Sequence, residues 1–386
     1  MTQKAVLGLA GDVLVDRDNP PEVFELVQPI LDATDLLFAN LEGPYTDHPV
    51  PAVSAPVQVT PGAKNLDVYA QCGFDVLAMA NNHIVDAGHA AMLETQQRLR
   101  EQGIATCGAG EHIAAAREPA MLEVRGTKVA FLSYSSIFPN GYEARANMPG
   151  VAPVRARNLY LEPAPNYHIP GTPGELITVP YEEDMAALGE DIAGARQRAD
   201  LVITTFHWGD FLRPFHLTDH ETRTARFCID AGADMVVGHH HHVLRGMEWY
   251  NGKPILYGLG HFVFDLRTEL PPELEQYKIS TGSSEDPDFY GVKPREGWPL
   301  LPLNAESRMT ALAWATLDGP AIDGIGFLPC WLKPDGRVFP GDPASDDGKA
   351  VVDYVAKGCS SQGLNGRIEA GGIELAGHAS VRVVPN

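Results

Sequence analysis

The chain has few basic residues, few cysteines and no long hydrophobic run, and each shortage excludes a class of protein. Only 29 of its 386 residues are Lys or Arg, against 50 Asp or Glu, which gives a formal net charge of −21. Because an acidic protein is repelled by nucleic-acid phosphates and anionic lipids, we expect no nucleic-acid partner. No apolar run approaches the roughly 18 residues of a membrane-spanning helix, so we expect no membrane partner either.

The cysteines are too scattered to predict a disulfide framework or a thiolate metal site. They show no CxxC spacing, and their number is odd: Cys72, Cys107, Cys228, Cys330 and Cys359. We therefore expect free thiols in a reducing compartment. The first apolar stretch breaks at Gly11-Asp12, before a signal-peptide core could form, so we predict a cytoplasmic location.

Short apolar runs alternate with amphipathic segments along most of the chain. The runs cover residues 5–10, 36–39, 76–80, 129–134, 201–206, 235–237 and 254–259, and the segments with helical spacing cover 22–33, 87–102, 182–198 and 219–231. Near-continuous apolar strands are typical of sheets covered on both faces. Their alternation with helices predicts a layered α/β core.

We expect a single domain over residues 1–386, because no linker is long enough to force a boundary. Two stretches rich in Pro, Gly, Asn or Tyr, 140–180 and 271–302, lack a sustained period and are expected to be long loop excursions. Each stretch has two possible interpretations: a lid or wall of a substrate site, or a plain surface insertion. The C-terminal portion, 305–386, is expected to be β-rich, with hairpin turns at Asp318-Gly319-Pro320 and Pro334-Asp335-Gly336.

Polar side chains follow five of the apolar runs at the point where each run ends. They include Asp12, Glu42, Asn81-Asn82-His83, His207 and the run His239 to His242. Taken singly, each fits a turn, a helix cap or a packed histidine, but four consecutive imidazoles have no obvious packing use. The carboxyl ends of strands are the edge where α/β sheets bind ligands, and carboxylate, amide and imidazole groups bind divalent ions. The pattern predicts a metal site at this edge.

The order of these motifs resembles the poly-γ-glutamate capsule-synthesis (CapA-type) family of the calcineurin-like metallophosphatase superfamily. The resemblance spans residues 4–265 and rests on Gly11-Asp12, Asn40-Leu41-Glu42, Ala80-Asn81-Asn82-His83, His207-Trp208-Gly209, Gly238-His239-His240 and Tyr257-Gly258-Leu259-Gly260-His261-Phe262-Val263-Phe264-Asp265. It implies a four-layer α/β/β/α metallophosphatase-like sandwich with two divalent ions, Mn, Fe or Zn, at the strand ends.

The resemblance also implies a role for each motif residue. Asp12 and Glu42 would supply carboxylates, with Glu42 bridging the ions where phosphatases place Asp. Asn82 and His207 would bind the second ion, and the pair would be completed by His239 or His240 together with His242. His83 would stand beside the ions and give a proton to the leaving group.

Four departures from the family pattern affect this site. Leu14 stands where phosphatases carry a histidine two residues after the first Asp, so one ion loses an imidazole and its site is expected to be weak or absent. His241 replaces a proline, Gly258 replaces a serine, and His261 replaces an asparagine.

Three functions are compatible with this pattern. The first is a metal-dependent hydrolase of a phosphoester or an amide or peptide bond, with a metal-bound hydroxide as the nucleophile. Its small-molecule or peptide substrate would be anionic and anchored by surface arginines, which could equally be plain solvated residues: Arg17, Arg213, Arg245 and Arg267.

The second function is a metal-independent isomerase or epimerase, with a peptide among its candidate substrates. Asp12 and a histidine such as His261 would exchange a proton across one carbon. The loss of the imidazole at position 14 and the gain of His261 favour it. The third is a non-catalytic binder of peptide or glycan. The presence of so many acidic, amide and imidazole side chains at strand ends argues against it.

Overall fold

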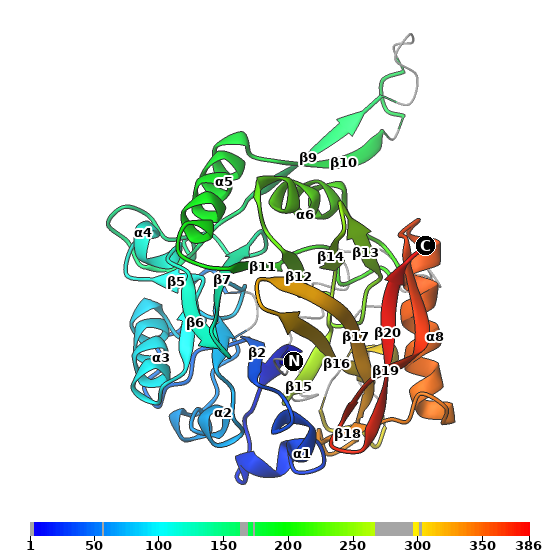
Figure 1. The fold of residues 1–386 in the computed structure, drawn as a ribbon. Coiled ribbons are helices and arrows are strands. Elements are labelled where there is room, and N and C mark those ends of the chain that lie inside the picture. Colours follow the sequence, from blue (N-terminus) through cyan, green and yellow to red (C-terminus); the bar gives the residue numbers. More distant parts are fainter. Residues whose placement is uncertain (1–3, 56–57, 163–168, 173, 267–295, 301–302) are drawn as a thin grey trace.

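The computed structural model describes residues 4–386 except for 56–57, 163–168, 173, 267–295 and 301–302 (Figure 1). Two β-sheets face each other at the centre, and helices cover their outer faces. This is the four-layer α/β/β/α sandwich, so the predicted fold class is confirmed.

The larger sheet has ten strands. Its parallel half runs β1 (Ala5–Leu14), β2 (Leu36–Leu41), β3 (Val76–Ala78) and β4 (Ala105–Cys107), and β15 (His261–Phe264) pairs in parallel with the end of β1. Its antiparallel half is formed by β16 (Met309–Asp318), β17 (Ala321–Leu332), β18 (Val338–Pro340), β19 (Gly366–Leu375) and β20 (His378–Pro385). The parallel strands β1, β2 and β3 are almost wholly buried, as their continuous apolar runs require.

The smaller sheet has six strands. In order across the sheet they are β13 (Met247–Tyr250), β14 (Lys253–Leu256), β12 (Met235–His239), β11 (Leu201–His207), β7 (Thr127–Ser135) and β6 (Ala120–Val124). The strands β14, β12, β11 and β7 are parallel, so their carboxyl ends lie at one edge.

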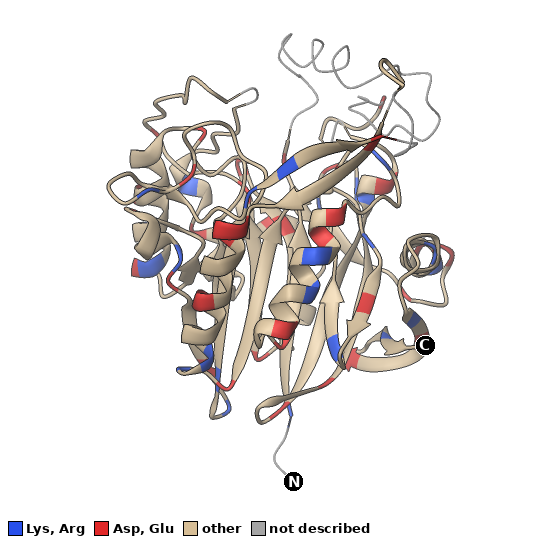
Figure 2. Ribbon diagram, turned by 90° about the horizontal axis from the view of Figure 1, so that it is seen from above, with Lys and Arg blue, Asp and Glu red and all other residues tan. Residues whose placement is uncertain are grey.

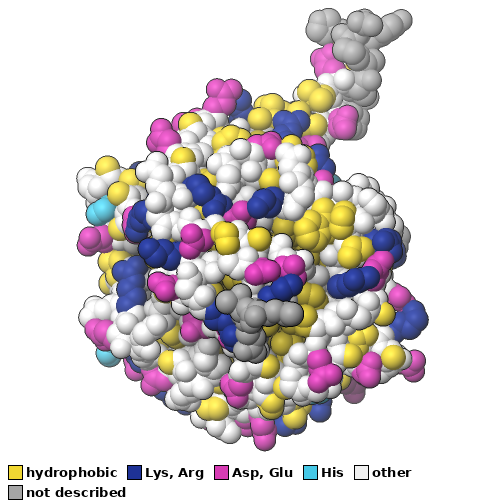
Figure 3. All heavy atoms as spheres, viewed as in Figure 1, with side chains coloured by type: hydrophobic (Ala, Val, Ile, Leu, Met, Phe, Trp, Pro, Cys, Tyr) yellow, Lys and Arg dark blue, Asp and Glu magenta, His cyan; other side chains and the backbone are white. Residues whose placement is uncertain are grey.

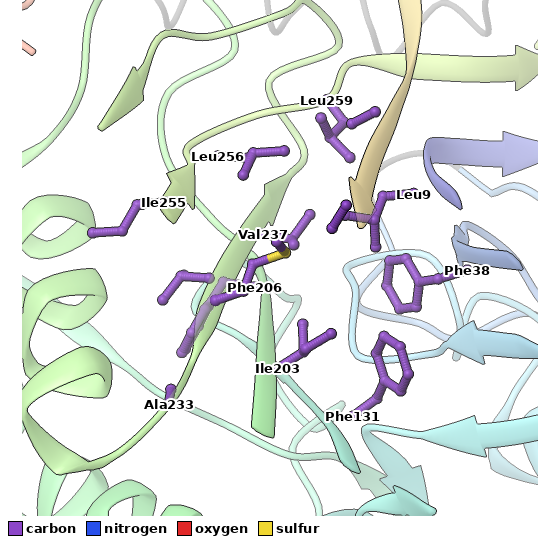
Figure 4. Close-up of a cluster of buried hydrophobic side chains, with 14 of the residues drawn as sticks. Leu9, Phe38, Phe131, Ile203, Phe206, Ala233, Val237, Ile255, Leu256 and Leu259 are labelled. Atoms are coloured by element: carbon purple, nitrogen blue, oxygen red, sulfur yellow. The ribbon is translucent and has the colours of Figure 1, made fainter. Parts of the chain in front are cut away.

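The core between the sheets is made of apolar side chains from both. Leu9 and Phe38 of the larger sheet face Phe131 and Ile203 of the smaller one (Figure 4). The rings of Phe38 and Phe131 are stacked, with centroids 5.3 Å apart.

Helices complete the outer layers. The larger sheet is covered by α1 (Gln28–Leu31), α2 (Val68–Gln71) and α3 (His89–Glu101), and the smaller by α5 (Glu182–Arg196) and α6 (Asp219–Ala231). A further helix, α8 (Asp346–Ser361), packs against β17 and β19. Acidic and basic positions lie mainly on helices and connecting segments (Figure 2), and charges of both signs are interspersed on the face seen in Figure 3.

The remaining short elements connect these layers. They are η1 (Pro20–Val23), η2 (Ala63–Asn65), β5 (Ala109–Gly110), α4 (Ile113–Ala116), β8 (Gly150–Val151) and η3 (Glu306–Arg308).

Each predicted strand overlaps an observed one, and three of the four predicted helices are confirmed. Helix α6 ends at Ala231 because Gly232 takes a left-handed φ of 113°. The prediction of one helix over 22–33 is wrong: η1 and α1 are separate four-residue pieces. Pro29 lacks an N–H and its ring would clash with the preceding turn, so the helix has to restart there.

The segment 140–180 is partly regular, contrary to expectation. Strands β9 (Ala156–Leu161) and β10 (Glu175–Pro180) form a hairpin that projects from the body (Figure 1). Its strands pair only with each other and expose much of their surface, so no clean apolar period marks them in the sequence. Most of 271–302 lies outside the described residues.

The C-terminal portion has the expected turns and, in addition, a helix that was not expected. Both predicted turns join hairpin strands, β16 to β17 and β17 to β18, whereas helix α8 was not expected.

All five cysteines are buried and free. Within the described ranges, no helix is both long enough and apolar enough to cross a membrane.

We predict that Phe131→Ala lowers the free energy of unfolding by about 3–5 kcal/mol, because it removes a stacked ring and leaves a cavity between the sheets. Urea-induced unfolding measures this change. The control is Tyr160→Ala on the exposed strand β9, where the side chain is 73% exposed and the change should stay within about 0.5 kcal/mol. Equal losses in both variants would contradict the inter-sheet packing.

Candidate metal centre and adjoining pocket

The carboxyl ends of strands from both sheets bring acids and imidazoles together. Asp12 lies on β1 beside its register partners Asn40 and His261, and His207 at the end of β11 is paired with His239 at the end of β12. The side chains of Asp12, Glu42, His207, His239, His240, His242 and His261 are all buried. The cluster therefore combines residues from distant parts of the chain.

Two groups in this cluster have the spacing of metal ligands. Asp12, His242 and His261 form one, and Asp12, Glu42 and His207 form the other, with candidate ligand atoms in each group within 4.8 Å of one another. Asp12 is common to both. Glu42 also faces both, because its Oε1 lies 3.8 Å from His207 Nε2 and 3.9 Å from His242 Nε2.

His261 stands where it can replace the imidazole that Leu14 does not provide. Leu14 is buried in the apolar core of the larger sheet. His261 lies on the neighbouring strand as the register partner of Asp12, and its Nε2 is hydrogen-bonded to His242 Nδ1. The first candidate group thus has two imidazoles despite the missing histidine.

The other predicted ligands gather around His207 and Asp12. Asn82 Oδ1 is 2.6 Å from His207 Nε2, and His240 Nδ1 is 3.0 Å from the same nitrogen. His239 Nδ1 lies 3.3 Å from Asp12 Oδ1. All the side chains predicted as ligands therefore lie in one cluster.

The backbone of the histidine run is strained. His240 has a φ of 90° and His242 a φ of 57°, in the left-handed region that residues with a Cβ seldom occupy. Strain of this kind persists where the surrounding structure holds it, and it is concentrated at functional sites.

Burial favours the neutral form of four imidazoles in the cluster. It lowers the pKa of His207 and His242 well below the ordinary value, that of His240 to about 3 and that of His261 to about 4. A neutral imidazole keeps the lone pair with which it binds a metal.

The pKa values of the two carboxyl groups shift in opposite directions. Burial raises the pKa of Glu42 well above its usual range, and the nearby charge of Asp12 adds to the rise. Burial also acts to raise the pKa of Asp12, but contacts with His239, His261 and Asn40 outweigh it and leave that pKa lowered.

The donor set fits divalent ions. Both carboxylate oxygens of Glu42 and the Nε2 of His239 are buried without a hydrogen-bond partner. Such groups are costly to bury unless something satisfies them. Two carboxylates with several neutral imidazoles are a ligand set that Zn²⁺, Mn²⁺ or Fe²⁺ accepts.

Asn40 supports the cluster and was given no role from the sequence. Its Nδ2 donates to Asp12 Oδ1 at 2.8 Å and lies 3.4 Å from His207 Nδ1. It fixes the orientation of the shared carboxylate. Its place in the Asn40-Leu41-Glu42 motif was the only signal for it.

His241 is turned away from the cluster. Its Nε2 is 2.7 Å from Glu221 Oε1, and Glu221 also accepts hydrogen bonds from Thr218 at the start of α6. A Cβ on Gly258 would lie 2.6 Å from His241 Nδ1, and one on Gly209 would lie 2.3 Å from Nε2. The ring occupies space that exists only because both positions are glycine.

A cavity of about 570 Å³ opens beside the cluster, and Asn82, His83 and His240 are part of its wall. His83 Nδ1 is 2.7 Å from Asp86 Oδ2, and His83 Nε2 is 4.0 Å from Glu42 Oε1. Asp86 is held by hydrogen bonds from the Val59 N–H at 2.8 Å and the Tyr142 hydroxyl at 2.7 Å.

Sequence reasoning missed this His83–Asp86 pair. The spacing of three residues between the two was its only local signal. Val59 and Tyr142 come from distant loops, so their hydrogen bonds to Asp86 require the folded chain.

The described arginines do not line this cavity. Arg17 is bound to Asp265, and Arg245 donates to the carbonyl oxygens of Asp210 and Arg213 at 2.6 and 2.8 Å. The Arg213 side chain is exposed and lies 3.4 Å from the Asp210 carboxylate. Arg267 lies outside the described residues, so a substrate-anchoring role for arginine stays a prediction.

Comparison with known proteins points to one family. The model of the bacterial capsule synthesis protein family PGA_cap matches residues 6–266. The PGA biosynthesis protein CapA of Bacillus subtilis (strain 168) is 29% identical over 262 residues, which cover 67% of this chain and 61% of that protein. A probable polyglutamine synthesis accessory protein of Mycobacterium tuberculosis is 32% identical over 238 residues, covering 60% and 56%.

Similar solved structures are more distant. A hypothetical protein from Thermus thermophilus has a TM-score of 0.44 at 14% identity and covers 87% of this chain and 99% of its own. The calcineurin-like phosphoesterase YfkN from Bacillus subtilis has a TM-score of 0.35 at 11% identity and covers 93% and 98%.

We predict that His261→Ala lowers the affinity of the cluster for divalent metal. Loss of a ligand should lower metal affinity by at least about tenfold, since even groups that only orient ligands contribute that much. Metal content after dialysis against Mn²⁺ or Zn²⁺, measured by mass spectrometry, checks this.

The matched control for that experiment is His220→Ala. His220 is also buried but is hydrogen-bonded to Ser136 and Thr218 instead of lying in the cluster. It should keep the metal content of the unaltered protein. Unchanged stoichiometry and affinity in His261→Ala would show that His261 is not a ligand.

Proposed function

The chain belongs to the bacterial capsule synthesis protein family PGA_cap, and from this membership and the geometry of the cluster we propose that it is a metal-dependent hydrolase of a phosphoester or an amide bond. The observation that carries the proposal is the Glu42 carboxylate, which is fully buried without a hydrogen-bond partner and faces imidazoles of both candidate ligand groups. A solvated loop acid or a helix cap would not be left in this state.

The chain's own side chains would hold the ions. Asp12 and Glu42 would contribute to both, with His242 and His261 on one and His207 on the other. His239 lies against Asp12, and Asn82 and His240 lie against His207. When bound, divalent ions acidify a water molecule and neutralise an oxyanion.

His83 is the proposed proton donor to the leaving group. Asp86 Oδ2 accepts from its Nδ1, which leaves Nε2 on the side of the cavity wall and Glu42. A proton held at Nε2 could pass to a leaving oxygen or nitrogen. The hydrogen bonds from Val59 and Tyr142 to Asp86 keep the ring in this orientation.

The isomerase alternative has weaker support. Its acid–base pair, Asp12 and His261, would have to flank a substrate carbon. Both side chains are fully buried on adjacent strands, whereas the cavity is lined by His83 and Asn82. We therefore retain hydrolysis as the proposal, and place it in a reducing compartment such as the cytoplasm because all five cysteines are free thiols.

We predict that Glu42→Gln abolishes both metal binding and turnover. The amide cannot supply the negative charge that faces both groups, so Mn²⁺ or Zn²⁺ should no longer raise the thermal midpoint of this variant as it raises that of the unaltered protein. Thermal unfolding with and without metal measures the effect. A variant that keeps metal-dependent stabilisation and full turnover would contradict the role of Glu42.

His83→Asn should separate proton transfer from metal binding. Metal content and folding should persist, while turnover of phosphoester or amide test substrates falls by about 10²–10⁴-fold. The control is His89→Asn on α3, a partly buried histidine bonded to the Gly141 carbonyl. Equal turnover in the two variants would exclude His83 as the proton donor.

A further inference from the structure

Part of the wall of the cavity beside the cluster is apolar. Ile137, Phe138 and Pro139 come from the loop after β7, and Phe211 comes from the loop after β11. All four side chains are only partly buried although they are apolar. Partly exposed apolar side chains grouped in one concave site are typical of a surface that binds a ligand.

Phe211 joins this apolar wall to the cluster. Its ring lies edge-on to the imidazoles of His240 and His242, with centroids 5.6 and 5.8 Å away. A substrate with its reactive bond over the cluster would therefore have Phe211 within reach of the neighbouring group.

The described residues that line the cavity carry one negative charge at most. Among the described residues that line it, Asp210 is the one Asp, Glu, Lys or Arg. The Asp210 Oδ1 accepts from the Leu212 N–H at 2.8 Å, and Arg213 approaches its Oδ2 only from an exposed position. A phosphate group or a glutamate side chain at this wall would meet a carboxylate, with no lysine or arginine among the described lining residues to offset it.

Amide side chains supply the polar contacts that a peptide backbone needs. Asn82 and Asn140 both line the cavity; the Oδ1 of Asn82 contacts His207 Nε2, so Asn82 offers its two donor hydrogens, whereas Asn140 offers one acceptor and two donor hydrogens. Apolar surface with a few amide groups matches an uncharged peptide segment better than a polyanion.

We infer that this cavity binds a peptide or amide substrate that carries an uncharged aromatic or branched apolar side chain next to the bond to be cleaved. The inference rests on the proposed hydrolase function and selects between its two substrate classes. The carbonyl carbon gains an oxygen from water and loses its bond to nitrogen, the nitrogen takes the proton from His83 Nε2, and a proton of the attacking water restores the proton on His83. The inferred substrate differs from the anionic substrate expected from the sequence, because no arginine that could anchor an anion is found at this wall among the described residues.

The test compares three substrate sets on the full chain loaded with Mn²⁺ or Zn²⁺. They are peptide amides with Phe or Leu beside the scissile bond, the same amides with Glu there, and phosphomonoesters and phosphodiesters. We expect kcat/KM for the Phe or Leu amides to exceed that of the Glu amides by about 10–100-fold, the range that one apolar contact gives.

Substitutions in the cavity wall show which residues cause the preference for Phe or Leu over Glu. Phe211→Ala should reduce the Phe-to-Glu ratio of kcat/KM by about tenfold, and Phe211→Leu, which keeps an apolar side chain, should restore most of it. Asp210→Asn should lower the ratio by improving the Glu amides. The control is Phe227→Ala on α6, a partly buried phenylalanine outside the cavity, which should leave the ratio unchanged.

Each outcome has a separate meaning. A preference for phosphoesters or Glu amides would overturn the inference while leaving the hydrolase function intact. Metal-loaded protein that turns over none of the substrates would overturn the hydrolase function instead. In that case calorimetric titration with N-acetyl-phenylalanine amide decides the inference: binding that Phe211→Ala abolishes supports it, and no binding overturns it.

Discussion

Two carboxyl groups buried side by side set the requirements for everything around them. Asp12 and Glu42 have no exposed surface, and two negative charges cannot stay together in a low-dielectric interior without compensation. The protein compensates with an amide donor from Asn40 and with imidazoles, and Glu42 alone of the two shows a strongly raised pKa. A pair of divalent ions would relieve the remaining imbalance, so the site's electrostatics and its proposed chemistry have the same origin.

The sheets provide what this arrangement needs, which is a fixed position for side chains from distant parts of the chain. Parallel strands from both sheets end at the cluster, and the packed core between them, including Phe38 against Phe131, sets the distance from one sheet to the other. The strained backbone at His240 and His242 is held by this frame. Rigid strands and a strained loop together place imidazoles where a flexible segment could not.

Much of this could be predicted from the sequence, because strand ends carry local signals. Apolar runs located β1, β2, β3, β11 and β12, and the polar residue after each run marked the site. Asp12 and His261 were expected to share one site, but their register pairing could not be predicted, since it depends on β15 pairing with β1 from the far end of the matched region. The same limit applies to the anchoring of His83 through Asp86 and Tyr142, and to a cavity wall built from two separate loops.

The contact between His241 and Gly258 couples substitutions at these two positions. With His241 in place, a serine at position 258 would put its Cβ 2.6 Å from the ring, so the ring would have to shift. Replacing His241 instead would leave Glu221 without its imidazole partner and the space beside Gly258 unfilled. The effect of a substitution at either position depends on the residue at the other. Chimeras that exchange the loop after β12 between family members should therefore exchange the segment around Gly258 with it.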